Sequence, residues 1–126
     1  MLSDLSTGLL YRNPKPHVRS EHAYFPSVAV LDNGDMLATV VVGEAFEAVN
    51  LDTWLFRSRD GGETWTCEGP LYPGTQGRLT SNASRIAVMP DGEIVINMVR
   101  VDRSAHPDEG LASHETLGFG PTELLL

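Results

Sequence analysis

The sequence predicts an all-β protein made of two successive antiparallel sheets, and three observations lead to this prediction. Short runs rich in β-branched and aromatic residues recur along the chain, as they do in strands. Asn-Gly, Asp-Gly and Gly-Gly dipeptides separate these runs and are typical of tight turns. The pattern around Asn33-Gly34 recurs around Asp91-Gly92, an offset of 58 residues, which indicates a structural repeat.

The first unit begins after an extended lead-in at residues 1–20, where two prolines favour extended backbone and no hydrophobic period is visible. The run 25–31 is predicted as the first strand, and Asn33-Gly34 as a hairpin turn. The run 36–42 is nearly all apolar, so we expect a second strand with both faces covered.

The polar, acidic stretch 43–52 is predicted as a loop, and the run 53–58 as a third strand. A turn containing two glycines then leads into a fourth strand over 65–71. These four strands form one up-and-down sheet, which we assign to residues 21–75.

A second unit, which we assign to residues 76–126, begins the same pattern again. Residues 84–96 align with residues 26–38, so we expect two strands around an Asp-Gly turn. The polar stretch 100–121 is predicted as a long loop, and residues 122–126 as the start of a third strand. Such a pair of sheets leaves both of its outer faces and one strand edge open, so self-association through the open faces is expected.

The turn between the third and fourth strands has a distinctive sequence, Ser58-Arg59-Asp60-Gly61-Gly62-Glu63-Thr64-Trp65. Asp60 is expected to accept hydrogen bonds from backbone N–H groups one to three residues further on. The two glycines can adopt the positive φ angles that the turn needs. Trp65 is large enough to anchor the hairpin against a neighbouring sheet, and we expect both Trp54 and Trp65 to pack between the sheets.

This turn is similar to the Asp-box of sialidases and related BNR-repeat β-propellers. The positions that carry the resemblance are Ser58, Asp60, Gly62, Thr64 and Trp65. The resemblance covers roughly residues 20–126 and implies the N-terminal part of a six-bladed, sialidase-like propeller, with about one and a half four-stranded antiparallel blades. A complete small β-sandwich, or a domain that assembles with copies of itself, is the alternative.

The alternation of strand direction predicts where a functional site would lie. The start of the first strand and the loop 43–52 share one end of the first sheet, whereas the hairpin turn and the Asp-box share the other end. Polar loops of both units meet at the first end, so we expect a site there.

The resemblance implies a glycan substrate, arginines that bind the sugar carboxylate, and an acid/base carboxyl group. Within the loop 43–52, Glu44 and Glu47 are the candidate catalytic residues, and a solvated acidic loop is the alternative reading of this stretch. Tyr24 occupies the position of the family's first arginine, because Ala23-Tyr24-Phe25-Pro26 matches its Phe-Arg-Ile-Pro-like motif. Arg19 could supply that charge from another direction.

Arg85 stands where the first unit has a small residue, and it could either bind an anion at the site or pair with a nearby carboxylate. We therefore name Arg19, Tyr24 and Arg85 as candidate substrate-binding residues.

The net charge of −8 over 126 residues disfavours a nucleic acid or an anionic membrane as partner. No apolar run approaches the ~20 residues of a membrane span, and the N-terminus lacks a signal-peptide pattern, so the cytoplasm is the default expectation. The four histidines show no metal-ligand spacing, and we expect neither a metal nor a cofactor.

Two functions fit these features. The first is a sialidase-like glycoside hydrolase of the exo-α-sialidase type, or its N-terminal fragment, acting on a glycan. The second is a non-catalytic Asp-box propeller that binds glycans or proteins. The absence of an arginine at position 24 favours a function other than that of a sialidase.

Overall fold

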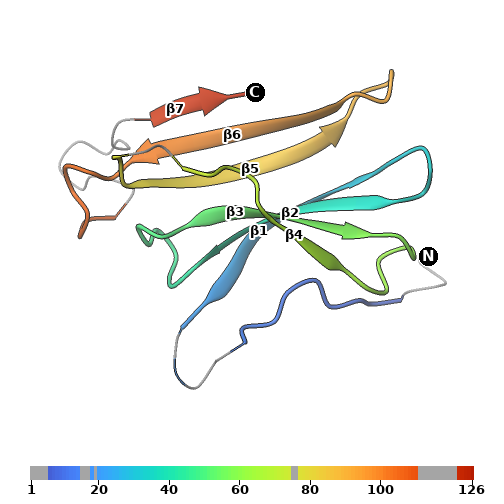
Figure 1. Ribbon diagram of the computed structural model, residues 1–126, viewed down its shortest axis with the longest axis horizontal. Helices are drawn as coiled ribbons and strands as arrows, with labels where there is room; N and C mark the ends of the chain where they lie inside the picture. The colour runs from blue at the N-terminus through green and yellow to red at the C-terminus, as the bar shows by residue number, and fades with distance from the viewer. Residues whose placement is uncertain (1–5, 15–17, 19, 75–76, 111–121) are drawn as a thin grey trace, which may run out of the picture.

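The computed structural model describes residues 6–14, 18, 20–74, 77–110 and 122–126, and these form two antiparallel sheets (Figure 1). The first sheet has the order β1-β2-β3-β4, with β1 at His22–Val30, β2 at Met36–Gly43, β3 at Asp52–Ser58 and β4 at Thr66–Pro70. The second sheet has the order β5-β6-β7, with β5 at Thr80–Val88, β6 at Ile94–Asp102 and β7 at Thr122–Leu125. The all-β prediction is confirmed. None of the described residues belongs to a helix that is long and apolar enough to span a membrane.

The strands fall where the sequence predicts them, but with different ends. β1 begins at His22, before the predicted Phe25, and β5 begins at Thr80, before the predicted Ser84. In both cases additional ladder pairs with the neighbouring strand extend the element. β4 begins only at Thr66, where pairing with β3 starts, and the preceding Trp65 donates an indole hydrogen bond back into the turn.

The two hairpin turns, β1–β2 and β5–β6, have the same hydrogen bonds. In each turn the N–H group on the entering side donates to the C=O group on the leaving side over 2.8 Å, from Leu31 to Asp35 and from Met89 to Glu93. Gly34 and Gly92 have φ angles of 86° and 85°. The repeat predicted at an offset of 58 residues is therefore confirmed at the level of single hydrogen bonds.

β5 is the strand of the second sheet that lies on the first sheet, where it packs against β1, β2 and β3 (Figure 1). Buried Ala29, Leu37 and Ile86 form the apolar core between the two sheets. The Ser27 hydroxyl of β1 accepts a hydrogen bond from the Ile86 N–H and donates one to the Ile86 C=O, over 3.2 and 3.3 Å. The two sheets are separate, stacked units and do not join into one continuous sheet.

The opposite face of the first sheet carries an apolar cluster of its own. Its buried members are Ala38, Val40, Val42 and Phe56. Leu10, Tyr11, Trp54 and Trp65 pack against them. The prediction that Trp54 and Trp65 pack between the two sheets is therefore wrong. Side chains alternate across a strand, so Trp54 lies on the face opposite to Leu55, and Leu55 packs toward the second sheet.

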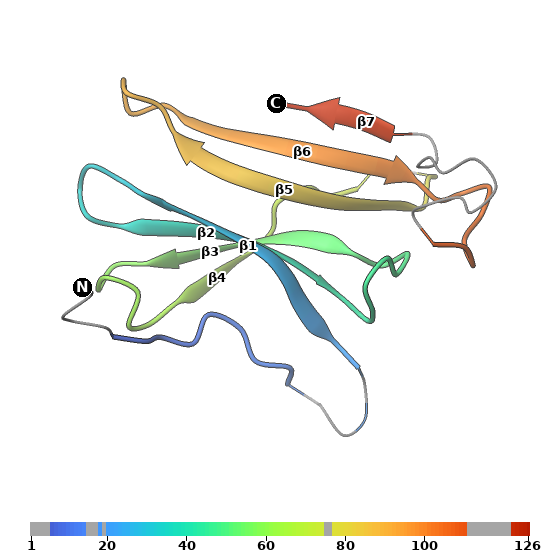
Figure 2. The ribbon, with the colours of Figure 1, turned by 180° about the vertical axis from the view of Figure 1, so that it is seen from behind.

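Residues 6–14 run along this outer face, on the side of the first sheet away from β5 (Figure 2). A Cβ atom at Gly8 would lie 1.9 Å from the carbonyl oxygen of Gly62, so a side chain cannot be placed there without movement of the backbone. The expectation that both outer faces are open is thus wrong for the part of the first sheet formed by β2 and β3, because the lead-in covers it there. The part on β1 stays open, where Val28 and Val30 are 47% and 60% exposed.

Candidate functional site

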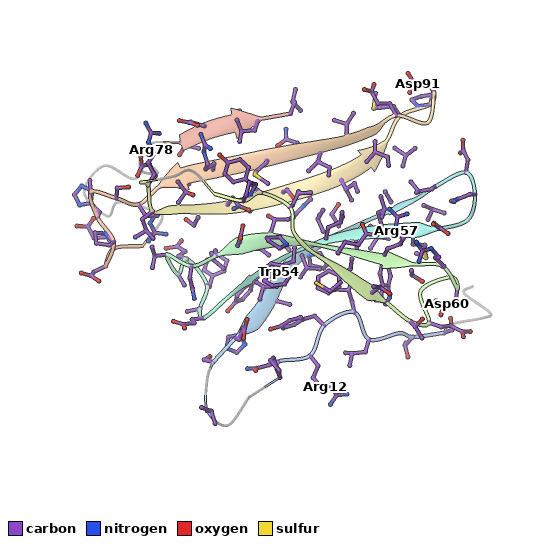
Figure 3. The ribbon with its side chains drawn as sticks, viewed as in Figure 1. Arg12, Trp54, Arg57, Asp60, Arg78 and Asp91 are labelled. Carbon is purple, nitrogen blue, oxygen red and sulfur yellow. The ribbon has the colours of Figure 1, made fainter. Side chains whose placement is uncertain are left out.

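The loops and the tight turns lie at opposite ends of the structure, as the alternation of strand direction predicts. The start of β1 and the loops 44–51 and 103–110 gather at one end, on the left of Figure 1. The hairpin turns and the Asp-box lie at the other end, where Figure 3 labels Asp60 and Asp91. We call the first of these the loop-rich end.

The Asp-box turn is closed by its own side chains. The Asp60 carboxylate accepts hydrogen bonds from the Thr64 N–H over 2.9 Å and from the Thr64 hydroxyl over 2.5 Å. The buried Ser58 hydroxyl donates to Asp60 over 2.7 Å and accepts from the Gly62 N–H over 2.8 Å. Asp60 therefore bonds four residues ahead rather than the predicted one to three, because the two glycines, both with positive φ, lengthen the turn.

These bonds also set the charge state of the turn. The bonds from the Thr64 hydroxyl, the Thr64 N–H and the Ser58 hydroxyl, in decreasing order of effect, lower the pKa of Asp60 to about 2. The Asp60 carboxylate makes these hydrogen bonds within the turn, and the turn lies at the end opposite to the loops. The Asp-box therefore has a structural role here.

At the loop-rich end, β1 is interrupted by a bulge between Tyr24 and Ser27. Phe25 in this bulge has a φ angle of 50°, in the left-handed region that bulky residues rarely adopt. Glu47, in the loop between β2 and β3, has a φ angle of 65°. Among the described residues, these are the two that have a positive φ without being glycine. Backbone strain of this kind is concentrated at functional sites.

The bulge and the loop together present an exposed group of rings that we call the aromatic cluster, which consists of His22, Tyr24, Phe25 and Phe46. The Phe46 ring lies 5.7 Å from the Phe25 ring and 6.0 Å from the Tyr24 ring, measured between centroids. Phe25 and Phe46 are 38% and 59% exposed, so apolar ring surface faces solvent. Tyr24, predicted to bind substrate, is therefore part of this cluster.

Arg85 of β5 lies over the aromatic cluster. Its guanidinium carbon is 5.6 Å from the centroid of the Phe25 ring, and its Nη1 donates hydrogen bonds to the carbonyl oxygens of Phe25 and Ser84, over 2.9 and 3.1 Å. Within the described part of the chain, Arg85 has no carboxylate at ion-pair distance. The exposed guanidinium thus contacts the ring and backbone of the first sheet, and not an acidic partner.

Glu44 and Glu47 line an open pocket of about 370 Å³ beside the aromatic cluster. Phe46 borders both features, and Asp108 and Glu109 also line the pocket. Arg103 also lines the pocket, although it is only 3% exposed. The alternation of strand direction places Arg103 at this end but assigns it no role, because a basic residue that follows a strand carries no specific signal.

Asp52, at the start of β3, is a half-buried carboxyl group at the same end. Burial raises its pKa, while hydrogen bonds from the Asn82 side chain and from the Thr53 N–H act in the opposite direction. Asn82 donates to Asp52 over 2.6 Å and accepts from the Thr53 N–H over 2.8 Å, so it joins β5 to β3. Asp52 and Asn82 line a second pocket of about 240 Å³ together with Tyr72. Sequence analysis assigned no role to this pair, since the contact joins residues 30 positions apart.

Two further predictions concern Arg19 and a metal ion. Arg19, named as a substrate-binding candidate, lies outside the described residues. Among those that are described, no group of three or more His, Cys, Asp and Glu side chains could hold a metal ion.

Comparisons of the chain with protein-family models, with curated proteins and with solved structures find no match. The function is therefore inferred from the chemistry of the loop-rich end.

Proposed function

We propose that the two sheets are successive blades of a sialidase-like Asp-box β-propeller, and that their loop-rich end binds a glycan as the substrate of a glycoside hydrolase. One observation carries this proposal: an exposed aromatic cluster lies beneath an arginine and beside a pocket lined by Glu44 and Glu47. Aromatic faces, a guanidinium and carboxyl groups are the parts from which sites for acidic sugars are made.

The propeller architecture is supported by the way the two sheets repeat and stack. Propeller blades are small up-and-down antiparallel sheets that repeat along the chain and pack on one another face to face. The hydrogen bonds of the two hairpin turns recur after 58 residues, and β5 packs against three strands of the first sheet. The side-chain bonds within the Asp-box turn fit the structural role that this motif has in such propellers.

The chemistry of the ligand follows from the exposed groups. The rings of Phe25 and Phe46 can pack against the apolar face of a pyranose ring. The guanidinium of Arg85 offers N–H groups to a carboxylate, and it carries a full positive charge at every physiological pH. An acidic sugar that contacts the rings and the guanidinium together is the ligand that fits this surface.

Glu47 is the stronger candidate for the general acid/base. It is half-buried at the pocket, whereas Glu44 is exposed. Its backbone is also held by a hydrogen bond from Arg103, which keeps its position defined. A positioned carboxyl group contributes about 10²–10⁴-fold to the rate of a reaction that needs proton transfer.

A second candidate function is the binding of glycans or proteins without catalysis. Tyr24 favours it, because this ring stands where the resemblance implies an arginine and it packs within the aromatic cluster at 6.0 Å from Phe46. A surface of rings with a single arginine beside it binds a ligand without providing the several cations that surround a sialic acid carboxylate in sialidases.

The test is to titrate the full chain with 3′-sialyllactose and with lactose while the backbone NMR signals are recorded. We expect 3′-sialyllactose to shift the signals of Tyr24, Phe25 and Phe46 and to bind more tightly than lactose. Arg85→Ala should weaken this binding by about tenfold or more, as the loss of one charge-assisted hydrogen bond does. The matched control is Arg59→Ala, at the Asp-box end, which should leave the affinity unchanged. Shifts confined to the Asp-box end, or none with either sugar, would contradict glycan binding at this site.

Hydrolysis of a fluorogenic sialoside separates the two candidate functions. If the protein is a hydrolase, Glu47→Gln should lower the rate by about 100-fold or more, and Glu44→Gln should have a smaller effect. Binding without any hydrolysis would instead support the non-catalytic function.

A further inference from the structure

Two arginines, one in β5 and one directly after β6, contact the two residues with a Cβ atom that have an unfavourable backbone conformation. Arg85 Nη1 donates to the carbonyl oxygen of Phe25, and Arg103 Nη1 donates to the carbonyl oxygen of Glu47, over 2.9 and 3.2 Å. Phe25 and Glu47 have φ angles of 50° and 65°. A residue with a Cβ atom remains in this region only where its surroundings hold it there.

The two arginines differ in how they are placed. Arg85 is exposed, so its contact can be replaced by water. Arg103 is 3% exposed, and its guanidinium donates to the Ser81 hydroxyl, to the Glu47 carbonyl and to the Glu109 carbonyl. All three acceptors are neutral, and within the described residues Arg103 has no ion pair with a carboxylate.

A buried guanidinium that bonds only neutral groups lowers the stability of the folded state, because its charge leaves water without gaining an opposite charge. If Arg103 only filled space, an apolar side chain of similar volume would leave the stability about the same or higher. The hydrogen bonds of Arg103 connect two loops, one that follows a strand of the first sheet and one that follows a strand of the second. The loop 44–51 is held through Glu47, and the loop 103–110 is held through Glu109.

We propose that Arg103 is a positioning residue for the glycan site. It holds Glu47 in the left-handed conformation and thereby places Glu47 at the pocket and Phe46 against Phe25. This inference rests on the proposed glycan-binding function for its consequence, but the positioning itself can be measured without any ligand. It also means that the site on the first sheet is complete only when the second sheet packs on it, because the arginine follows β6.

The chain offers a matched control in Arg78, which also lies at the loop-rich end (Figure 3). Arg78 forms ion pairs with Asp102 and Glu123, both in the second sheet, at 3.7 Å. Removing it takes away an arginine that flanks the second sheet, as Arg103 does, but whose ion pairs do not involve the loop that carries Glu47.

The experiment compares Arg103→Ala with Arg78→Ala in the full chain, using two readouts. The first is the set of NOE contacts between the rings of Phe46 and Phe25, recorded without ligand. The second is the affinity for 3′-sialyllactose. In Arg103→Ala we expect the NOE contacts to disappear and the affinity to fall by about tenfold or more, the equivalent of one charge-assisted hydrogen bond. Arg78→Ala should retain both.

Chemical rescue adds a test that a merely structural role would not pass. Because Arg103 lines an open pocket, millimolar guanidinium should enter the space left in Arg103→Ala and restore the ring contacts and the affinity. Ammonium at the same ionic strength should not, since it cannot span the Glu47 and Glu109 carbonyls. If Arg103→Ala does not fold, Arg103→Lys replaces it, and the ring contacts should weaken there because lysine lacks the planar fork.

The outcomes distinguish this inference from the proposed function. Intact ring contacts in Arg103→Ala would overturn the positioning of the loop, and lost contacts with an unchanged affinity of a chain that binds 3′-sialyllactose would overturn its role in the glycan site. If the contacts disappear in Arg103→Ala while the wild-type chain binds neither 3′-sialyllactose nor lactose, Arg103 does position the loop and the proposed glycan function is the part that fails.

Discussion

Asn33 and Asp91 hold the same hydrogen bond in two different sheets. Each side chain accepts through Oδ1 from the backbone N–H two residues ahead, over 3.0 Å in the first sheet and 3.1 Å in the second. The residues lie 58 positions apart, and the glycine that follows each one has almost the same φ angle, 86° and 85°. The two turns therefore have the same side-chain hydrogen bond and the same glycine conformation, and they should respond alike to substitution.

Alanine at either turn glycine should lower the stability by a similar amount. A left-handed residue with a Cβ atom costs about 1–2 kcal/mol relative to glycine. The added methyl group meets nothing within 4 Å at Gly34, and at Gly92 only an Asp32 carboxylate oxygen at 3.7 Å. Urea denaturation of Gly34→Ala and Gly92→Ala measures the loss. Asparagine, which tolerates this conformation better, is the control and should lose less. A large loss at one turn with none at the other would show that the two turns are not equivalent.

The Asp-box should make the stability depend on acid pH in a defined direction. The pKa of Asp60 is about 2 in the folded protein, below the ~3.9 of an unfolded chain. The stabilisation from its ionised form is therefore fully present above pH ~4 and is lost as the pH falls through about 2. In the wild type, the denaturation midpoint should therefore fall as the pH is lowered between these two values. It should fall less steeply in Asp60→Ala, with Asp108→Ala as the comparison variant.

The lead-in should detach from the first sheet when Gly8 is replaced. A Cβ at Gly8 would lie 1.9 Å from the Gly62 oxygen, which is itself fixed because it accepts the Trp65 indole N–H over 3.0 Å. Gly8→Ala should therefore displace residues 6–14 and increase amide hydrogen exchange at Leu10 and Tyr11, with a loss of about 1–3 kcal/mol. Ser6→Ala, two residues before Gly8 and exposed, is the control. Unchanged protection at Leu10 would mean that the segment is held without this contact.

The contact between Asn82 and Asp52 should respond to charge. In Asn82→Asp, two carboxylates would face each other where Asn82 now donates over 2.6 Å, so the pKa of the pair should rise above that of an unfolded chain. The variant should lose about 1–3 kcal/mol or more at pH 7, and it should recover as the pH falls through the raised pKa, because the folded state then takes up a proton.

The control for this variant is Asn82→Ala, which removes the same hydrogen bonds without adding a charge. It should also lose stability, since the contact joins β5 to β3, but with a much weaker dependence on pH. A pH-independent loss in Asn82→Asp would indicate that the two side chains separate in the variant.

The sequence by itself determined the features that depend on residues close together in the chain. Both hairpin turns and the Asp-box were predictable, because their hydrogen bonds join residues no more than a few positions apart and each turn needs particular residue types. The strands were predictable because runs of β-branched and aromatic residues mark them between the turns. The end of the structure at which the loops gather followed from the alternation of strand direction alone.

Only the tertiary structure decided which side chains meet across the two sheets. Arg85 reaches Phe25 over 60 positions and Arg103 reaches Glu47 over 56, and no local pattern encodes either contact. The placement of Trp54 and Trp65 under the lead-in was missed for the same reason, since alternation along a strand defines two faces but not what covers each one. Contacts of this kind depend on how the sheets stack, and stacking is set by the sum of many apolar contacts and not by any single residue.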